Sequence, residues 1–151
     1  MGTLGERLLA ARAKKQAARE ETIEVPGYEG QLWATYRPLD FREARKIGQA
    51  HEHLRDEIEK ELRVAADTLV AACTGCEARI DGETHPLPPL GLELCEQIGL
   101  EGAENPRQAV LLLFPSEMAV VKQFVDVQGL EEASNGQIDE QLMGESQAVT
   151  G

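Results

Sequence analysis

The sequence is poor in aromatic residues and in cysteine, and it lacks any long apolar run. Aromatic residues make up 4% of its 151 residues, although hydrophobic residues make up 42%, so a core must be built mainly from Leu, Val, Ile and Ala. No run approaches the roughly 20 apolar residues of a membrane-spanning helix, and the charged residues 1–21 do not have the pattern of a secretory leader. The three cysteines leave one unpaired in any disulfide scheme, which favours a reducing cytosol. We therefore expect a cytoplasmic protein that does not contact a membrane.

Basic residues are scarce in the second half of the chain, and the net charge is −12 overall. Residues 1–76 contain 13 acidic and 12 basic residues, whereas residues 77–151 contain 14 acidic and only three basic residues. Because this excess of negative charge repels a phosphate backbone, we expect no nucleic-acid partner. Residues 129–151 have five acidic residues, no basic residue and few apolar ones. This composition predicts a flexible acidic tail, because it cannot offset an ordering cost of roughly 1–2 kcal/mol per residue.

The N-terminal segment, residues 1–21, predicts an amphipathic helical arm. Thr3 is a suitable N-cap, and a thin apolar stripe includes Leu4 and Leu8. Basic residues outnumber acidic ones in this segment. An isolated helix of this length is barely stable in water. We therefore expect it either to dock on a partner or to fray.

Residues 22–128 predict one compact, mainly α-helical α+β domain with one or two small β-hairpins. The N-terminal hairpin pairs residues 22–25 with residues 32–37, which alternate polar and apolar side chains. Residues 79–84 contain an Asp-Gly turn and predict a second small hairpin. We expect Trp33 to anchor the first hairpin on the core, and an exposed recognition role is the alternative.

Helical patterns account for most of this domain. One pattern runs from the N-cap Asp40 to about Cys73, and Gly48 marks a possible break into one short and one long helix. Residues 90–98 and 105–114 predict two short helices, of which the second is almost wholly apolar and is expected to be buried.

A last helix is predicted after the N-cap Ser116, ending near Gly129. The residues expected to face inward are Met118, Val121, Val125 and Phe124.

The cysteines raise the question of a metal site. Cys73 and Cys76 have the spacing of a zinc half-site, with His85 and Cys95 as further candidates downstream. The second pair is not closely spaced, and Cys73 and Cys95 lie on apolar helical faces, so we expect buried structural cysteines and no metal. Whether the four side chains come together is left open, and a small metal-dependent regulator is the alternative that depends on them.

No pattern of a catalytic site occurs in the sequence. His51 and His53 are two residues apart on a predicted helix, so they point in different directions, and we expect both to be exposed to solvent. There is no phosphate-binding loop and no nucleophile elbow. We therefore expect no enzymatic activity, no catalytic residue and no cofactor.

The order of segments does carry a resemblance. A strand ending in Tyr36-Arg37-Pro38-Leu39 leads directly into the helix that begins at Asp40, and a long helix then ends in Leu69-Val70-Ala71-Ala72-Cys73. An Asp-Gly hairpin follows, and the apolar helix from Asn105 to Phe114 precedes the capped helix at Ser116. Over roughly residues 22–128, this order resembles the tail assembly chaperones of long-tailed bacteriophages.

The resemblance implies a small, mostly helical, non-enzymatic protein of the host cytoplasm. Such a protein binds the tape-measure protein while tail-tube subunits polymerise around it, and some members also have a longer, frameshifted form. The opposite charges of the basic arm and the acidic half also predict a homo-oligomer, in which these parts of different copies attract each other. The alternative is a small structural virion protein of the tail or head–tail region. The candidate partner-binding residues are Leu4, Leu8, Met118, Val121 and Val125.

Overall fold

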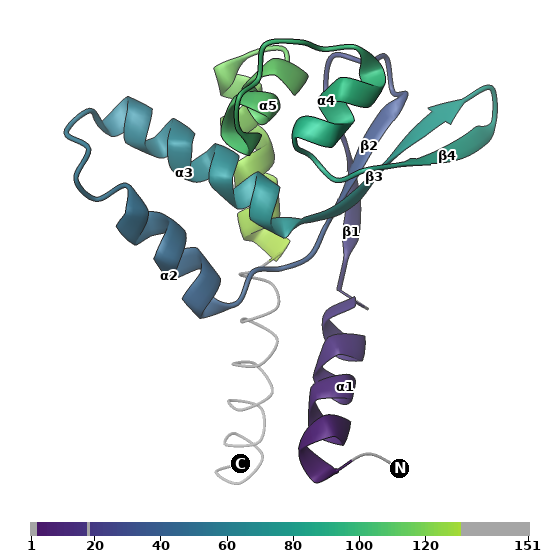
Figure 1. Cartoon of the computed structure of the whole chain (residues 1–151), viewed down its shortest axis with the longest axis vertical. Coiled ribbons are helices and arrows are strands. Elements are labelled where there is room, and N and C mark those ends of the chain that lie inside the picture. The colour runs from purple at the N-terminus through teal and green to yellow at the C-terminus, as the bar shows by residue number, and fades with distance from the viewer. Residues whose placement is uncertain (1–2, 18, 131–151) are drawn as a thin grey trace, which may run out of the picture.

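The computed structural model of the chain describes residues 3–17 and 19–130. Helices pack on one face of a four-stranded antiparallel sheet of order β1-β2-β3-β4, and α1 extends away from the sheet (Figure 1). In chain order, the elements are α1 (Leu4–Ala17), β1 (Glu21–Glu24), β2 (Leu32–Tyr36), α2 (Phe41–Ala50), α3 (Glu57–Ala72), β3 (Cys73–Ile80), β4 (Glu83–Leu87), α4 (Leu92–Ile98), α5 (Pro106–Leu113) and a last helix over residues 117–130. The predicted mainly helical α+β class is confirmed. The predicted acidic tail lies outside the described residues except for residues 129 and 130, which are helical.

Both predicted hairpins are present, and they join into one sheet because β2 pairs with β3. The turn between β3 and β4 uses Asp81 and Gly82, whose φ angles of 52° and 79° are both positive. A two-residue hairpin turn of this kind requires positive φ at both positions, which explains the Asp-Gly pair. The second hairpin extends beyond the predicted residues 79–84, since β3 already begins at Cys73, directly after α3, and β4 continues to Leu87.

Trp33 does not anchor the hairpin on the core, so that expectation was wrong. Side chains alternate between the two faces of a strand, and the inner positions of β2 belong to Leu32, Ala34 and Tyr36, which are all buried. Trp33 lies on the outer face of the sheet beneath Arg79, whose guanidinium carbon is 4.1 Å from the centre of the indole ring. The aromatic anchor of the hairpin is therefore Tyr36.

The helix between β2 and β3 is divided as predicted, but at a later position. Asp40 and Glu43 form the expected capping box, and α2 continues through Gly48 to Ala50 before α3 begins. Arg37 joins these helices, since its guanidinium donates two hydrogen bonds to Glu43, at 2.9 and 2.7 Å. It also donates to the carbonyl of Ala71 at 3.3 Å, in the last turn of α3, where a cation is favoured. One arginine thus fixes the start of α2 against the end of α3.

The last helix buries a different face from the one predicted. Val120, Gln123 and Val127 are buried, whereas Met118 is 81% exposed and Val125 is 57% exposed. The expectation that Met118, Val121 and Val125 face inward was therefore wrong for the first and last of them, and Val121 is half-buried. Val120 and Val127 are seven residues apart, just as Met118 and Val125 are, so the spacing alone does not select a face.

A polar contact in the core explains this choice of face. Gln123 accepts a short hydrogen bond from the Tyr36 hydroxyl and donates to the carbonyl of Glu24 at 3.0 Å. Buried polar groups need such partners, and only the observed rotation of the helix brings Gln123 to the sheet. Ala109, Val110, Leu113 and Phe114 of the apolar segment are buried as expected, whereas Leu111 is half-buried and Leu112 is exposed. None of the described helices is long and apolar enough to cross a membrane.

Candidate functional site

The helix over residues 117–130 presents an apolar stripe to solvent. Met118, Val121 and Val125 follow one another at steps of three and four residues, so they lie on one face of the helix. Met118 and Val125 are mostly exposed, and Val121 is half-buried beside them. Ser116 caps this helix, accepting from the backbone of Ala119 at 3.1 Å. The stripe is therefore held on a helix whose other face is fixed to the core.

The helix α1 carries a second exposed stripe. Leu4 is 76% exposed and Leu8 is 63% exposed, and both lie on one face, one turn apart. The predicted cap is present, because the Thr3 hydroxyl accepts from the backbone of Glu6 at 3.2 Å. An ion pair between Arg12 and Asp40, at 3.7 Å, connects this helix to α2. The structure thus places both predicted partner-binding segments on exposed helical surfaces.

An apolar cleft lies at the end of β2 opposite α1, and no local sequence pattern predicts it. It has a volume of about 320 Å³, and its lining residues belong to the end of α4 and the loop after it, the β3–β4 hairpin, the turn before β2 and the start of β2. The hydroxyl of Tyr28 at its wall donates to the carbonyl of Leu113, and burial raises the pKa of Tyr28. Its lining residues are Tyr28, Gln31, Leu32, Ala78, Ile80, Leu87, Ile98 and Leu100.

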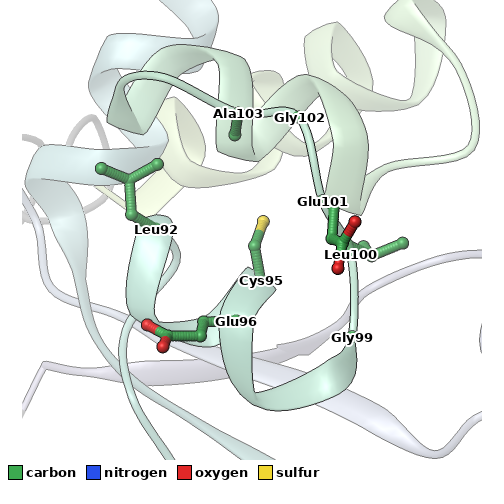
Figure 2. A pocket seen from close by; sticks show the side chains of 8 residues that line it. All are labelled: Leu92, Cys95, Glu96, Gly99, Leu100, Glu101, Gly102 and Ala103. Carbon is green, nitrogen blue, oxygen red and sulfur yellow. The ribbon is translucent and has the colours of Figure 1, made fainter.

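A second hollow of about 430 Å³ lies at the end of α4. Figure 2 shows its lining side chains, with the Cys95 thiol between α4 and the loop that follows. The thiol donates to the carbonyl of Ala109 at 3.6 Å, and burial raises the pKa of Cys95. Since the nucleophilic form of cysteine is the thiolate, this raised pKa disfavours a nucleophilic role for Cys95.

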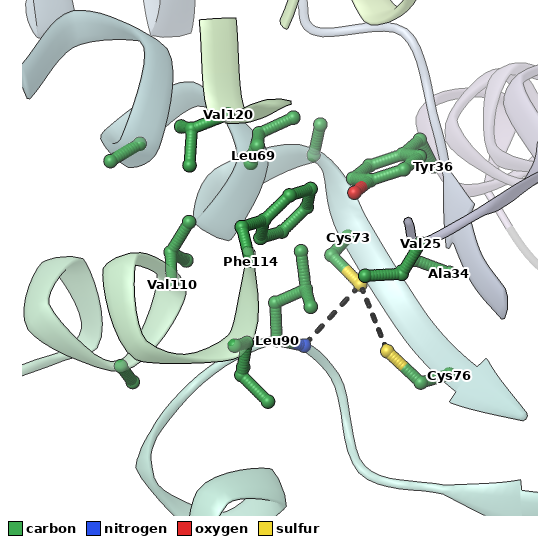
Figure 3. Close-up of a cluster of buried hydrophobic side chains, with 14 of the residues drawn as sticks. Val25, Ala34, Tyr36, Leu69, Cys73, Cys76, Leu90, Val110, Phe114 and Val120 are labelled. Atoms are coloured by element: carbon green, nitrogen blue, oxygen red, sulfur yellow. Dashed lines mark hydrogen bonds between the residues drawn. The ribbon is translucent and has the colours of Figure 1, made fainter. Parts of the chain in front are cut away.

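Cys73 and Cys76 meet on the inner face of β3 (Figure 3). Residues three apart on a regular strand point to opposite faces. Here the register slips, since Thr35 pairs with Gly75 and Tyr36 with Cys73, and this irregularity turns both thiols inward, 3.9 Å apart. Cys73 also accepts a hydrogen bond from the backbone of Leu90 at 3.4 Å. Hydrogen bonds from Cys76 and then from Leu90, against the opposing effect of burial, lower the pKa of Cys73.

The four candidate zinc ligands do not come together. Cys95 contacts α5, and His85 lies on β4, 3.6 Å from Glu83. Within residues 3–17 and 19–130, no group of three or more His, Cys, Asp or Glu side chains is placed to hold a metal ion. All three cysteines are buried as expected, but Cys73 lies on strand β3 with Cys76, so its expected place on a helical face was wrong.

A polar cluster that joins three helices was missed by sequence reasoning. His51 is 4% exposed, so the expectation that it faces solvent was wrong, whereas His53 is exposed as expected. The Nε2 atom of His51 is 2.6 Å from Oδ2 of Asp67, and Arg107 donates two hydrogen bonds to the same carboxylate, each at 2.9 Å. Nδ1 of His51 is buried without a hydrogen-bond partner. Because Nε2 is bonded to Asp67 and Nδ1 is buried out of reach of a substrate, the geometry fits a structural role better than general base catalysis.

The partners in this cluster are 16 and 40 residues apart along the chain, so no local spacing signals them.

Four of the five predicted partner-binding residues are strongly exposed in the structure, and Val121 is half-buried. Comparisons of the chain with protein-family models, with curated proteins and with solved structures find no match.

Proposed function

We propose that this protein is a non-enzymatic assembly chaperone of a long-tailed bacteriophage, which binds the tape-measure protein in the host cytoplasm during tail morphogenesis. The observation that carries the proposal is the exposed stripe of Met118, Val121 and Val125 on a helix that is otherwise fixed to the core. The resemblance in the order of segments supplies the identity of the partner.

The stripe has the properties of a helix-binding surface. Amphipathic helices recognise helical partners through apolar residues at steps of three and four, which is the spacing here. Burying a side chain such as Met118 or Val125 contributes roughly 1.5–3 kcal/mol, and methionine adapts to irregular partner surfaces. Glu117 and Asp126 are exposed on the same helix, and their charges help to keep the protein soluble while the stripe has no partner.

Co-expression with a helix-rich fragment of the tape-measure protein from the same genome tests the proposal. We expect the chain to raise the amount of fragment that remains in the supernatant, and Met118→Glu to abolish this effect because it places a charge in the contact. Ile58→Glu is the matched control, since Ile58 is 77% exposed on α3, away from the stripe. An unchanged amount of fragment with the wild-type chain would count against a chaperone.

Purified phage particles distinguish this proposal from the alternative, a small structural virion protein. A chaperone leaves the assembly, so we expect no stoichiometric band of this chain in mature particles. A stoichiometric band would favour the structural protein.

A further inference from the structure

The apolar cleft between α4 and the β3–β4 hairpin has an acidic surround. Glu29, Asp81 and Glu101 each directly follow a lining residue in the chain. Glu83 pairs with the lining residue Ile80 across the hairpin, so these two side chains share a face of the sheet. All four acidic residues are exposed. The segments that carry the lining residues, 28–32, 78–87 and 98–100, contain a single lysine or arginine, Arg79. Its side chain lies over Trp33 on the outer face of the sheet. The cleft therefore favours an apolar ligand that carries positive charge.

The helix α1 has this character. Two of its three exposed leucines, Leu4 and Leu8, lie between Arg7 on one side and Arg12 on the other when the helix is viewed along its axis. The side chains of residues 3–14 are all exposed, so this described part of the helix has no packed face. A helix of 14 residues is marginal without tertiary packing. It is consequently stabilised when its leucines are covered.

The α1 helix of the same chain is directed away from the cleft. It precedes Glu21, which pairs with Tyr36, whereas the cleft lies at Leu32 at the other end of β2. These ends are about 13 Å apart at ~3.3 Å per residue, and α1 leaves the sheet at the far end and runs outward (Figure 1). The α1 helix that fits the cleft is therefore that of a second copy.

We propose that copies of this protein associate head to tail, with the leucine stripe of α1 from one copy seated in the acidic-rimmed cleft of the next. The two surfaces differ, so the contact is heterologous and each added copy leaves a new cleft and a new helix free. The product is an open chain or a ring of copies, and the stripe of Met118 and Val125 takes no part in the contact.

Sedimentation velocity on the full chain tests this arrangement from about 1 μM to about 1 mM, the range of weak to moderate affinities. We expect the mean mass to rise with concentration beyond that of a dimer, and to fall when salt is added, since exposed charges are screened. Leu8→Glu and Ile80→Glu should each weaken association at least about tenfold. Ile58→Glu, a control of equal charge change, should leave association unchanged.

A mixing experiment makes the test specific. Leu8→Glu leaves an intact cleft and Ile80→Glu leaves an intact helix, so an equimolar mixture should form dimers and nothing larger. Neither substitution touches a buried residue, and unchanged thermal melting will confirm that both variants fold. A wild-type chain that stays monomeric throughout, oligomers that persist in Leu8→Glu, or a mixture that stays monomeric would each overturn the proposal.

Discussion

Asp67 shows how a single residue holds distant helices together. Burial raises its pKa, but the hydrogen bonds and charges of Arg107 and His51 outweigh this effect, so the pKa of Asp67 lies below its ordinary value. A carboxylate with a lowered pKa stabilises the fold at pH values above its unfolded pKa, about 3.9, and loses this contribution as pH falls through the folded pKa. The contact between α3, α5 and the turn after α2 should therefore weaken in acid.

We predict that Asp67→Asn lowers the free energy of unfolding at neutral pH by roughly 1–3 kcal/mol, because it leaves Arg107 and His51 without their carboxylate. Urea unfolding at a series of pH values measures this effect. The variant should also lose less stability than the wild type between about pH 5 and about pH 2.

Glu59→Gln is the matched control, since Glu59 forms an exposed ion pair with Arg63 at 2.6 Å. Such a pair contributes about 0.3–0.5 kcal/mol. An acid dependence that is identical in Asp67→Asn and the wild type would contradict the account of this cluster.

What the sequence reveals about single residues depends on the distance between partners. The caps at Thr3, Asp40 and Ser116 were predictable, because each cap and its partner lie within three residues. His51 and Gln123 were not, since their hydrogen-bond partners lie 16 or more residues away. Local spacing therefore predicts where elements begin, but not which polar side chains enter the core.

The last helix shows the same limit at the scale of an element. Its existence and start were predictable from the Ser116 cap, but apolar residues occupy both of its faces. Val120 and Val127 pack inward, and Met118 and Val125 remain outside. The hydrogen bonds of Gln123 to the sheet determine how the helix is rotated about its axis, and their partners lie far from Gln123 in the sequence.

A matched pair of substitutions tests this rotation. We predict that Val127→Ala lowers the free energy of unfolding by about 2 kcal/mol, because Val127 is buried and a cavity remains. Val125→Ala should change it by less than about 0.5 kcal/mol, because Val125 is mostly exposed. Urea unfolding of the two variants side by side decides the matter, and a larger loss for Val125→Ala would show that the predicted inward face is the buried one.

The hairpins were predictable as elements for a different reason. The alternation of β2 and the Asp81-Gly82 turn are local signals, and both are present in the sheet. The pairing of β2 with β3 joins segments about 40 residues apart, and it comes with a register slip beside Thr35. No local pattern predicts that slip, although it decides that Cys73 and Cys76 share the core.

At the scale of the whole molecule, the charge and the exposed apolar surfaces are separated. The basic α1 extends from one end of the sheet (Figure 1). The acidic-rimmed cleft lies at the other end of β2, beside Leu32. The stripe of Met118 and Val125 belongs to a third surface. The sequence indicated the acidic second half and the stripe of α1, but it predicted that Met118 and Val125 face inward. The cleft depends on three segments that meet only in the fold.

This separation allows one chain to contact another copy and a different protein at the same time. Self-association is proposed to use α1 and the cleft, and the tape-measure protein is proposed to bind helix 117–130. A row of copies joined head to tail then presents the same stripe repeatedly, which suits a long helical partner.

Site-specific photo-crosslinking tests the central claim most directly. A photoreactive amino acid is placed at Met118 in one preparation and at Ile58 in another, and each is illuminated in cells that express the tape-measure protein of the same genome. The account predicts a cross-link to the tape-measure protein from position 118 and none from position 58, because only the former lies on the exposed stripe. Equal cross-linking from both positions, or none from position 118, would contradict it.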